Sequence, residues 1–391
     1  MEQSSEQTRW VRIELGAIRF NYQQIRAQLK PQVRVLAVVK GEAYGHGAVE
    51  VSRLLEGLGA NMLGVTTVAE GVELRRNGLT APILVFGPFL PEEATSIILH
   101  DLTATIASLE AINWLGTAAQ ELCRQIPVHF KLETGMGRTG LWPEEIVTAT
   151  SALTKFPELQ LEGIYTHLAT AAWADSSYAN QQFKLFQQMI IELETCGYTG
   201  LLRHIANSAA LLKYPHMHLD MVRTGTLLYG QYPTPSLEKT IQLEDPWSFQ
   251  AKVNYIRELP AGHSVGYGRT YTTTKPTRVA VIPVGFSDGL QMEPVLKPVN
   301  LLEVIKGSAK LLLQYLGHSR MDVPIIFPAG RGRIIGKIGM QLSMVDITGI
   351  QGIEIGTVAN IPLRRTAVNP LIAKVFVDAQ MGAEIYMEIN S

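Results

Sequence analysis

Short apolar runs recur along the N-terminal part of the chain, and segments with helical spacing of apolar residues lie between them. The run at residues 33–39 is rich in valine, which is typical of a strand buried on both faces of a parallel sheet. Seven further runs follow it, at residues 62–65, 83–86, 103–106, 128–132, 161–165, 202–205 and 221–222. Strands that alternate with helices pair in parallel, so these eight runs predict a closed (β/α)8 barrel of the TIM type.

The pattern changes near residue 245, where segments begin to alternate or run apolar between turn signals, without crossover helices. We therefore expect the barrel to occupy residues 13–244 and a second, mostly antiparallel β domain to occupy residues 245–391. Residues 1–12 are assigned to the β domain, because a strand that precedes the barrel has no partner inside it.

Charge and composition narrow the class of partner. The chain has 391 residues, and 34 basic against 35 acidic side chains give a net charge of −1. This balance gives no case for a nucleic acid or a membrane surface as partner, so a small molecule is expected. No segment approaches the roughly 20 apolar residues that span a bilayer. The polar N-terminus lacks a secretory signal, and we expect a cytoplasmic protein.

The two cysteines, Cys123 and Cys196, do not make a disulfide framework and lack metal-ligand spacing. We expect both to be small buried residues, and no metal site is predicted.

Polar side chains follow several of the predicted strands. The first run is followed by Lys40 and by glycines at positions 41, 45 and 47, which demand a tight turn or a close approach. Later runs are followed by Arg138 in ETGMGRTG, His167 in THLAT, Asn207 and Ser208 in ANSAA, and Arg223 in RTGTLLYG. Barrel enzymes keep their active sites at the carboxyl ends of the strands. A strand-end lysine near glycine-bearing loops suggests a cofactor with a carbonyl and a phosphate, such as pyridoxal phosphate.

The segment AVVKGEAYGHG resembles the cofactor-lysine motif of alanine racemases, and ETGMGRTG, YTHLAT, HIANSAA, VRTGTLLYG, VGYGRTY and IPVGFSDG resemble further motifs of that family in the same order. The resemblance covers nearly the whole chain. It implies an isomerase of the fold-type III barrel class that uses pyridoxal 5'-phosphate to interconvert L-alanine and D-alanine for peptidoglycan. It also implies a homodimer whose active sites are shared across the interface.

The resemblance implies two catalytic bases. Lys40 would form the aldimine with the cofactor and act as one base, and Tyr267 in VGYGRTY, from the partner's β domain, would act as the other. Racemisation removes a proton on one face of a planar carbanion and returns one on the opposite face, so two groups must flank the cofactor. Without its flanking glycines, Tyr267 would be interpreted as a packed aromatic residue of a strand.

The resemblance also gives roles to the other strand-end residues. Arg223 would face the pyridine nitrogen as a donor that stays charged. Arg138 would touch the phenolic oxygen of the cofactor and the substrate carboxylate, which the backbone amide of Met340 would also hold. His167 and His204 would link Tyr267 to Arg223. The phosphate would be bound by Tyr44, Ser208, Gly225 and Thr226, with Asn207 in a supporting position.

Simpler interpretations remain open for some of these residues. Ser208 could cap a helix, and Lys131, which family members can carry as a carbamate, could form a plain salt bridge. The glycines around Arg138 also spell G-x-G-x-x-G, but no acidic ribose partner supports a dinucleotide site. A serine or broad-specificity racemase, a decarboxylase or aldolase of the same fold, and a non-catalytic cofactor carrier stay as alternatives.

Three departures from the family concern the β domain. In KIGMQLSMVDI, Gly339 and Gln341 replace the usual cysteine and aspartate around Met340. The C-terminal region lacks the tyrosine that normally reaches the phosphate. The insertion at residues 295–322 has no family counterpart, and its segment 301–316 has the apolar spacing of a helix.

Overall fold

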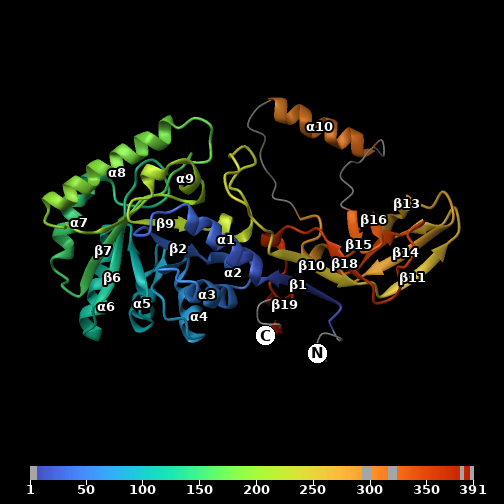
Figure 1. Cartoon of the computed structure of the whole chain (residues 1–391), viewed down its shortest axis with the longest axis horizontal. Coiled ribbons are helices and arrows are strands. Elements are labelled where there is room, and N and C mark those ends of the chain that lie inside the picture. The colour runs from blue at the N-terminus through green and yellow to red at the C-terminus, as the bar shows by residue number, and fades with distance from the viewer. Residues whose placement is uncertain (1–6, 293–300, 316–323, 379–382, 388–391) are drawn as a thin grey trace. The chain divides into compact units, whose positions relative to one another are not determined.

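The computed structural model describes residues 7–292, 301–315, 324–378 and 383–387. It divides the chain into two compact units (Figure 1). One unit is Glu14–Pro246, and the other joins Met1–Ile13 to Trp247–Ser391.

The first unit contains eight parallel strands in the spatial order β8-β7-β6-β5-β4-β3-β2-β9. Their bounds are β2 (Arg34–Val38), β3 (Met62–Val65), β4 (Ile83–Val85), β5 (Thr103–Ile106), β6 (Ile126–Lys131), β7 (Leu159–Tyr165), β8 (Leu202–His204) and β9 (Met221–Thr224). Two backbone hydrogen bonds connect the edges, from Asp220 N–H to the Arg203 carbonyl (3.2 Å) and from Arg223 N–H to the Ala206 carbonyl (2.9 Å). The sheet is a nearly closed barrel, which confirms the predicted fold class.

Helices follow the strands and bury their apolar stripes against the sheet (Figure 1). They are α1 (Leu15–Ala27), α3 (Ala48–Gly57), α4 (Val68–Arg76), α5 (Ala94–Leu99), α6 (Leu109–Leu122), α7 (Ile146–Leu153), α8 (Ser177–Thr195) and α9 (Ser208–Lys213). In α3, for example, Val51 and Leu55 are fully buried one turn apart. Apolar residues at helical spacing, Ile18, Tyr22 and Ile25, are likewise buried in α1.

The second unit contains a ten-stranded sheet in the order β11-β14-β17-β16-β15-β18-β10-β1-β19-β20. Its strands are β1 (Arg9–Glu14), β10 (Trp247–Lys252), β11 (Tyr255–Leu259), β14 (Thr277–Ile282), β15 (Pro324–Phe327), β16 (Gly330–Ile335), β17 (Ser343–Asp346), β18 (Val358–Ile361), β19 (Lys374–Asp378) and β20 (Ala383–Met387). β1 pairs antiparallel with β10, and the predicted mostly antiparallel domain is confirmed. The segment 248–258 is two strands, because the chain leaves the sheet at Val253 and Asn254.

The inserted helix is present as α10 (Leu301–Tyr315), and the rest of the insertion lies outside the described residues. No helix in the described ranges combines the length and the apolar character needed to cross a membrane. The expectation of buried cysteines is wrong: Cys123 is exposed at the C-terminal end of α6, and Cys196 is partly exposed after α8.

The turn after β2 is left-handed. Within α2 (Lys40–Gly45), residues 41–44 have φ between 49° and 59°, although only Gly41 among them is a glycine. Each other residue in this region costs roughly 1–2 kcal/mol, so the surroundings must hold the turn. The carboxylate of Glu70 accepts from the Gly41 N–H (2.6 Å), and His46 Nδ1 donates to the Ala43 carbonyl (2.8 Å).

Two glycine substitutions separate backbone strain from steric crowding. A Cβ added to Gly41 or to Gly57 in α3 would meet no atom within 4 Å, but only Gly41 has a positive φ. We expect Gly41→Ala to lower the free energy of unfolding by about 1–2 kcal/mol, and Gly57→Ala to raise it by about 0.5–1 kcal/mol. Urea denaturation at one protein concentration measures both values. Equal effects of the two substitutions would contradict the left-handed turn.

Candidate active site

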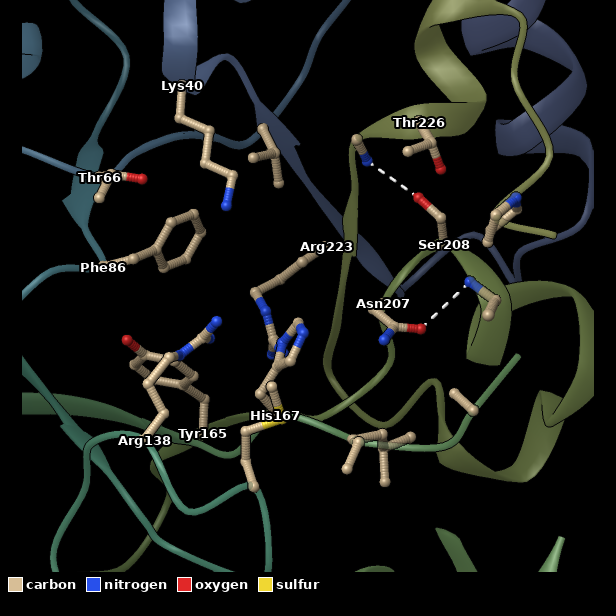
Figure 2. Close-up of a pocket in the computed structure, with 18 of the residues that line it drawn as sticks. Lys40, Thr66, Phe86, Arg138, Tyr165, His167, Asn207, Ser208, Arg223 and Thr226 are labelled. Atoms are coloured by element: carbon tan, nitrogen blue, oxygen red, sulfur yellow. Dashed lines mark hydrogen bonds between the residues drawn. The ribbon is translucent and has the colours of Figure 1, made fainter. Parts of the chain in front are cut away.

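A cavity of about 570 Å³ lies at the carboxyl ends of the barrel strands. It brings together most of the residues that the sequence predicts for the site, and Figure 2 shows how several of them, among them Lys40, Arg138 and Arg223, line it. These residues are Lys40, Tyr44, Lys131, Arg138, His167, Asn207, Ser208, Arg223, Gly225 and Thr226. They come from the loops after different strands, so the barrel itself assembles the site.

Lys40 is the first residue of α2 and faces the cavity beside Thr66 and Phe86, which follow β3 and β4 (Figure 2). Burial lowers the pKa of Lys40, the positive charge of Arg138 lowers it further, and Glu70 acts in the opposite direction. The net shift favours the neutral amine, which is the form that reacts with a carbonyl and accepts a proton.

Arg223 lies at the centre of the cavity floor and is 4% exposed. One of its terminal nitrogens donates to the carbonyl of His204 (2.8 Å) and to His204 Nδ1 (3.1 Å). The other donates to the Thr166 carbonyl (2.7 Å) and, at 3.4 Å, to His167 Nδ1. A guanidinium has no acceptor, so both histidines must present a lone pair to it.

The charge of Arg223 also determines the protonation of these histidines. Burial and the nearby guanidinium lower the pKa of His167 to about 3. The same two causes hold the pKa of His204 well below its usual value. Both imidazoles are therefore neutral at physiological pH. The predicted link of the pair to Arg223 is present, and the link to Tyr267 stays a prediction.

The loop that carries Arg138 is held by Glu133. The Glu133 carboxylate accepts from the backbone N–H groups of Gly135 (2.5 Å), Met136 (2.6 Å) and Arg138 (3.3 Å). Arg138 itself is exposed and has no side-chain hydrogen bond to the described residues, so its guanidinium is available to a ligand.

Lys131 lies near this loop and donates to the hydroxyl of Thr139. Burial first, and then the charges of Arg138 and Arg223, lower the pKa of Lys131 to about 8. A substantial fraction of its amine is neutral near that pH.

The other end of the cavity forms a cradle. The Gly225 N–H donates to Ser208 Oγ (3.0 Å), and a Cβ at Gly225 would come within 2.6 Å of the Tyr44 hydroxyl oxygen. Thr226 Oγ1 is buried without a hydrogen-bond partner among the described residues. A buried hydroxyl without a partner is costly, so this end is suited to a ligand rich in acceptors. The helix cap is Asn207, whose Oδ1 accepts from the N–H groups of Ala209 and Ala210, and Ser208 is the first residue of α9.

Two predicted site residues belong to the second unit. Tyr267 begins a 3₁₀ turn between β12 (Ser264–Val265) and β13 (Tyr271–Thr272), and its side chain is 77% exposed. It is therefore not a packed strand residue. Met340 is 62% exposed, and its N–H has no acceptor among the described residues.

Sequence reasoning missed three residues that support the site. Tyr165 in β7 is buried, its hydroxyl bonds to Thr105 Oγ1 (2.9 Å), and its ring stacks on His204 with centroids 4.8 Å apart. His129 in β6 bonds to His204 (3.0 Å). Glu133 stood in a quoted motif, and an acidic residue beside a glycine-rich loop could have signalled an acceptor for its amides. Tyr165 and His129 gave no such signal, because the alternation of side chains along a strand does not distinguish residues that only pack in the core from residues that support the site.

Comparisons with known proteins match the same family along nearly the whole chain. The family models described as alanine racemase, N-terminal domain, and alanine racemase, C-terminal domain, match residues 13–233 and 247–370. An alanine racemase of Methanococcus maripaludis is 35% identical over 90% of this chain and 88% of its own length. One from Desulfosudis oleivorans is 36% identical over 89% of this chain and 85% of its own length.

Solved structures show the same relationship. The alanine racemase of Clostridium difficile 630 has a TM-score of 0.86 and 28% identity, with 98% of both chains covered. That of Bacillus anthracis with bound L-Ala-P has a TM-score of 0.83 and 25% identity, again with 98% of both chains covered. Since the two family models match both structural units and the curated relatives match nearly the full length, this chain belongs to the alanine racemase family.

Proposed function

We propose that this protein is a homodimeric racemase that interconverts L-alanine and D-alanine with pyridoxal 5'-phosphate, and that Lys40 and Tyr267 are its two proton carriers. The observation that carries the proposal is the content of one cavity. It brings together a lysine whose pKa is lowered, a cationic hydrogen-bond donor and a buried threonine hydroxyl without a hydrogen-bond partner among the described residues. The D-alanine would serve peptidoglycan synthesis in the cytoplasm, as the family resemblance implies.

The residues of the cavity fit the functional groups of the cofactor. Thr226 Oγ1 lacks a partner, and Gly225 leaves room for the Tyr44 hydroxyl beside Ser208, so these residues would hold the phosphate. In Figure 2, Lys40 and this cradle lie on opposite sides of Arg223. Lys40 would thus receive the aldehyde, the cradle would receive the phosphate, and Arg223 would meet the ring nitrogen.

When bound, pyridoxal phosphate condenses with the amino group of an amino acid and withdraws electrons from its Cα, which acidifies the Cα–H bond. The chain must then orient the ring and move the proton. Arg223 would donate a hydrogen bond to the ring nitrogen without giving up its own proton. The ring nitrogen would then stay unprotonated, so the ring would withdraw fewer electrons from Cα. We propose that this weaker electron withdrawal suppresses side reactions.

Proton transfer on two faces requires two groups. Lys40 can take up a proton at Nζ, because burial and the charge of Arg138 lower its pKa and so favour the neutral amine. Tyr267 would act on the opposite face through its hydroxyl, with His167 as its link to the Arg223 network. Arg138 and the N–H of Met340 would hold the substrate carboxylate, since neither has another partner among the described residues.

Exposed apolar side chains support the homodimer. Besides Tyr267, the second unit exposes Phe286, Met340 and Leu342. The barrel exposes Leu90, Trp142 and Trp173 on loops that follow its strands. Exposed apolar groups gathered near functional residues are typical of interaction surfaces. We propose that a second copy of the chain covers them and contributes its Tyr267.

Carbamylation of Lys131 stays a prediction. The lowered pKa of Lys131 favours the neutral amine, which is the form that reacts.

The function is tested with purified protein and one lysine variant. Wild-type protein should show visible cofactor absorption that Lys40→Ala loses, because the amine that binds the aldehyde is gone. In deuterium oxide, either alanine enantiomer should be converted to the other with deuterium at Cα. Carbon dioxide release would instead identify a decarboxylase, and bound cofactor without turnover would identify a carrier.

Tyr267→Phe tests the second base. Racemisation should fall by roughly 10²–10⁴-fold in both directions, because each direction uses both groups. We assign removal of the Cα proton of L-alanine to Tyr267 and that of D-alanine to Lys40. In Tyr267→Phe, D-alanine should therefore still acquire deuterium at Cα through Lys40, whereas L-alanine should not. NMR of each enantiomer in deuterium oxide measures this exchange. Full racemisation, or equal exchange of the two enantiomers, would contradict the assignment.

A further inference from the structure

A third histidine continues the hydrogen bonds of Arg223 into the barrel. His129 lies in β6, fully buried, and its Nδ1 is 3.0 Å from His204 Nε2. The pairing of β6 with β7 shifts register between Val128 and His129, which places Gly163 opposite the imidazole. A Cβ at Gly163 would come within 2.7–2.9 Å of the His129 ring atoms. The local backbone thus makes room for this ring.

The direction of the hydrogen bonds is fixed by Arg223. Its guanidinium can only donate, so His204 Nδ1 accepts and the single proton of the neutral His204 lies on Nε2. That proton is donated to His129 Nδ1, and the proton of His129 therefore lies on Nε2. This last nitrogen is buried and has no partner among the described residues.

We propose that His129 is a positioning residue for Arg223, which acts by accepting the His204 proton and so holding the His204 lone pair toward the guanidinium. The inference rests on the proposed function, in which Arg223 faces the cofactor ring. It concerns a side chain that touches neither cofactor nor substrate.

The unpartnered Nε2 of His129 indicates that this residue positions Arg223 and does not merely stabilise the fold. A buried N–H without an acceptor is unfavourable, and an apolar side chain of similar size would avoid it. The barrel keeps a polar ring where only its Nδ1 is used. Burial and Arg223 also lower the pKa of His129 to about 3, so the ring can serve as an acceptor across the physiological range.

The first test reads the tautomers directly. In protein labelled with ¹⁵N-histidine, two-bond ¹H–¹⁵N spectra should show the proton of His204 on Nε2 and its Nδ1 unprotonated, with the signals assigned by their loss in His204→Gln. This measurement does not depend on cofactor or activity. A His204 proton on Nδ1 in the wild-type protein would overturn the proposal.

The second test uses a matched pair of variants. In His129→Asn, Oδ1 replaces Nδ1 as acceptor at the same position along the side chain, whereas His129→Leu places a methyl group there. His129→Leu should alter the ¹⁵N and ¹H shifts of His204, and His129→Asn should preserve the Nε2–H tautomer. In the holoenzyme, the side reaction that releases pyruvate and leaves the amino group on the cofactor should rise roughly 10–100-fold per racemisation turnover in His129→Leu. It should stay near the wild-type ratio in His129→Asn.

Two results would contradict the proposal: unchanged His204 shifts and side-reaction ratio in His129→Leu, or equal impairment in both variants. Should His129→Leu not fold, the asparagine variant and the wild-type tautomer still decide the matter. If the protein does not racemise alanine, the tautomer measurements still test the hydrogen-bond chain. Failure of the proposed function and failure of this inference are therefore distinguishable.

Discussion

The buried positive charge of Arg223 is the constraint on which the barrel's site depends. No carboxylate pairs with it among the described residues. Its two terminal nitrogens donate to backbone carbonyls and to two imidazole nitrogens, and its Nε–H is left for a ligand. Burying an ion without a counter-charge is costly unless its hydrogen bonds are complete. The guanidinium also lies 5.2 Å from the centre of the Tyr165 ring, whose face attracts a cation.

This one charge explains much of the electrostatics around it. His129, His167 and His204 stay neutral first because they are buried, and second because protonating any of them would place another cation beside Arg223. Burial lowers the pKa of Lys131 most, and the charges of Arg138 and then Arg223 lower it further. The site therefore contains neutral bases around a fixed donor, an arrangement that suits proton transfer at neutral pH.

The hydrophobic pattern predicted most of the fold, because buried parallel strands read as short apolar runs and the eight runs correspond to β2 through β9. The strand-end position likewise identified Lys40 and Arg223. The left-handed turn was not predicted, since three of its four residues are not glycines. Three further roles could not be predicted, namely the helix cap at Asn207 and the hydrogen-bond acceptors Glu133 and His129. They depend on contacts between segments far apart in sequence or on the local path of the backbone. Solvent exposure of Cys123 depends likewise on where α6 ends, which apolar composition does not reveal.

We propose that the barrel of one copy supplies half of the chemistry and that an exposed turn of the second unit in another copy supplies the other half. A heterodimer of one Lys40→Ala chain and one Tyr267→Ala chain, purified through two different tags, tests this division most directly. Shared sites would leave one intact active site and one doubly altered site in each dimer, so the heterodimer should regain about half of the wild-type activity although each variant homodimer is inactive. A heterodimer as inactive as the two homodimers would contradict the account, because each site would then draw both groups from a single chain.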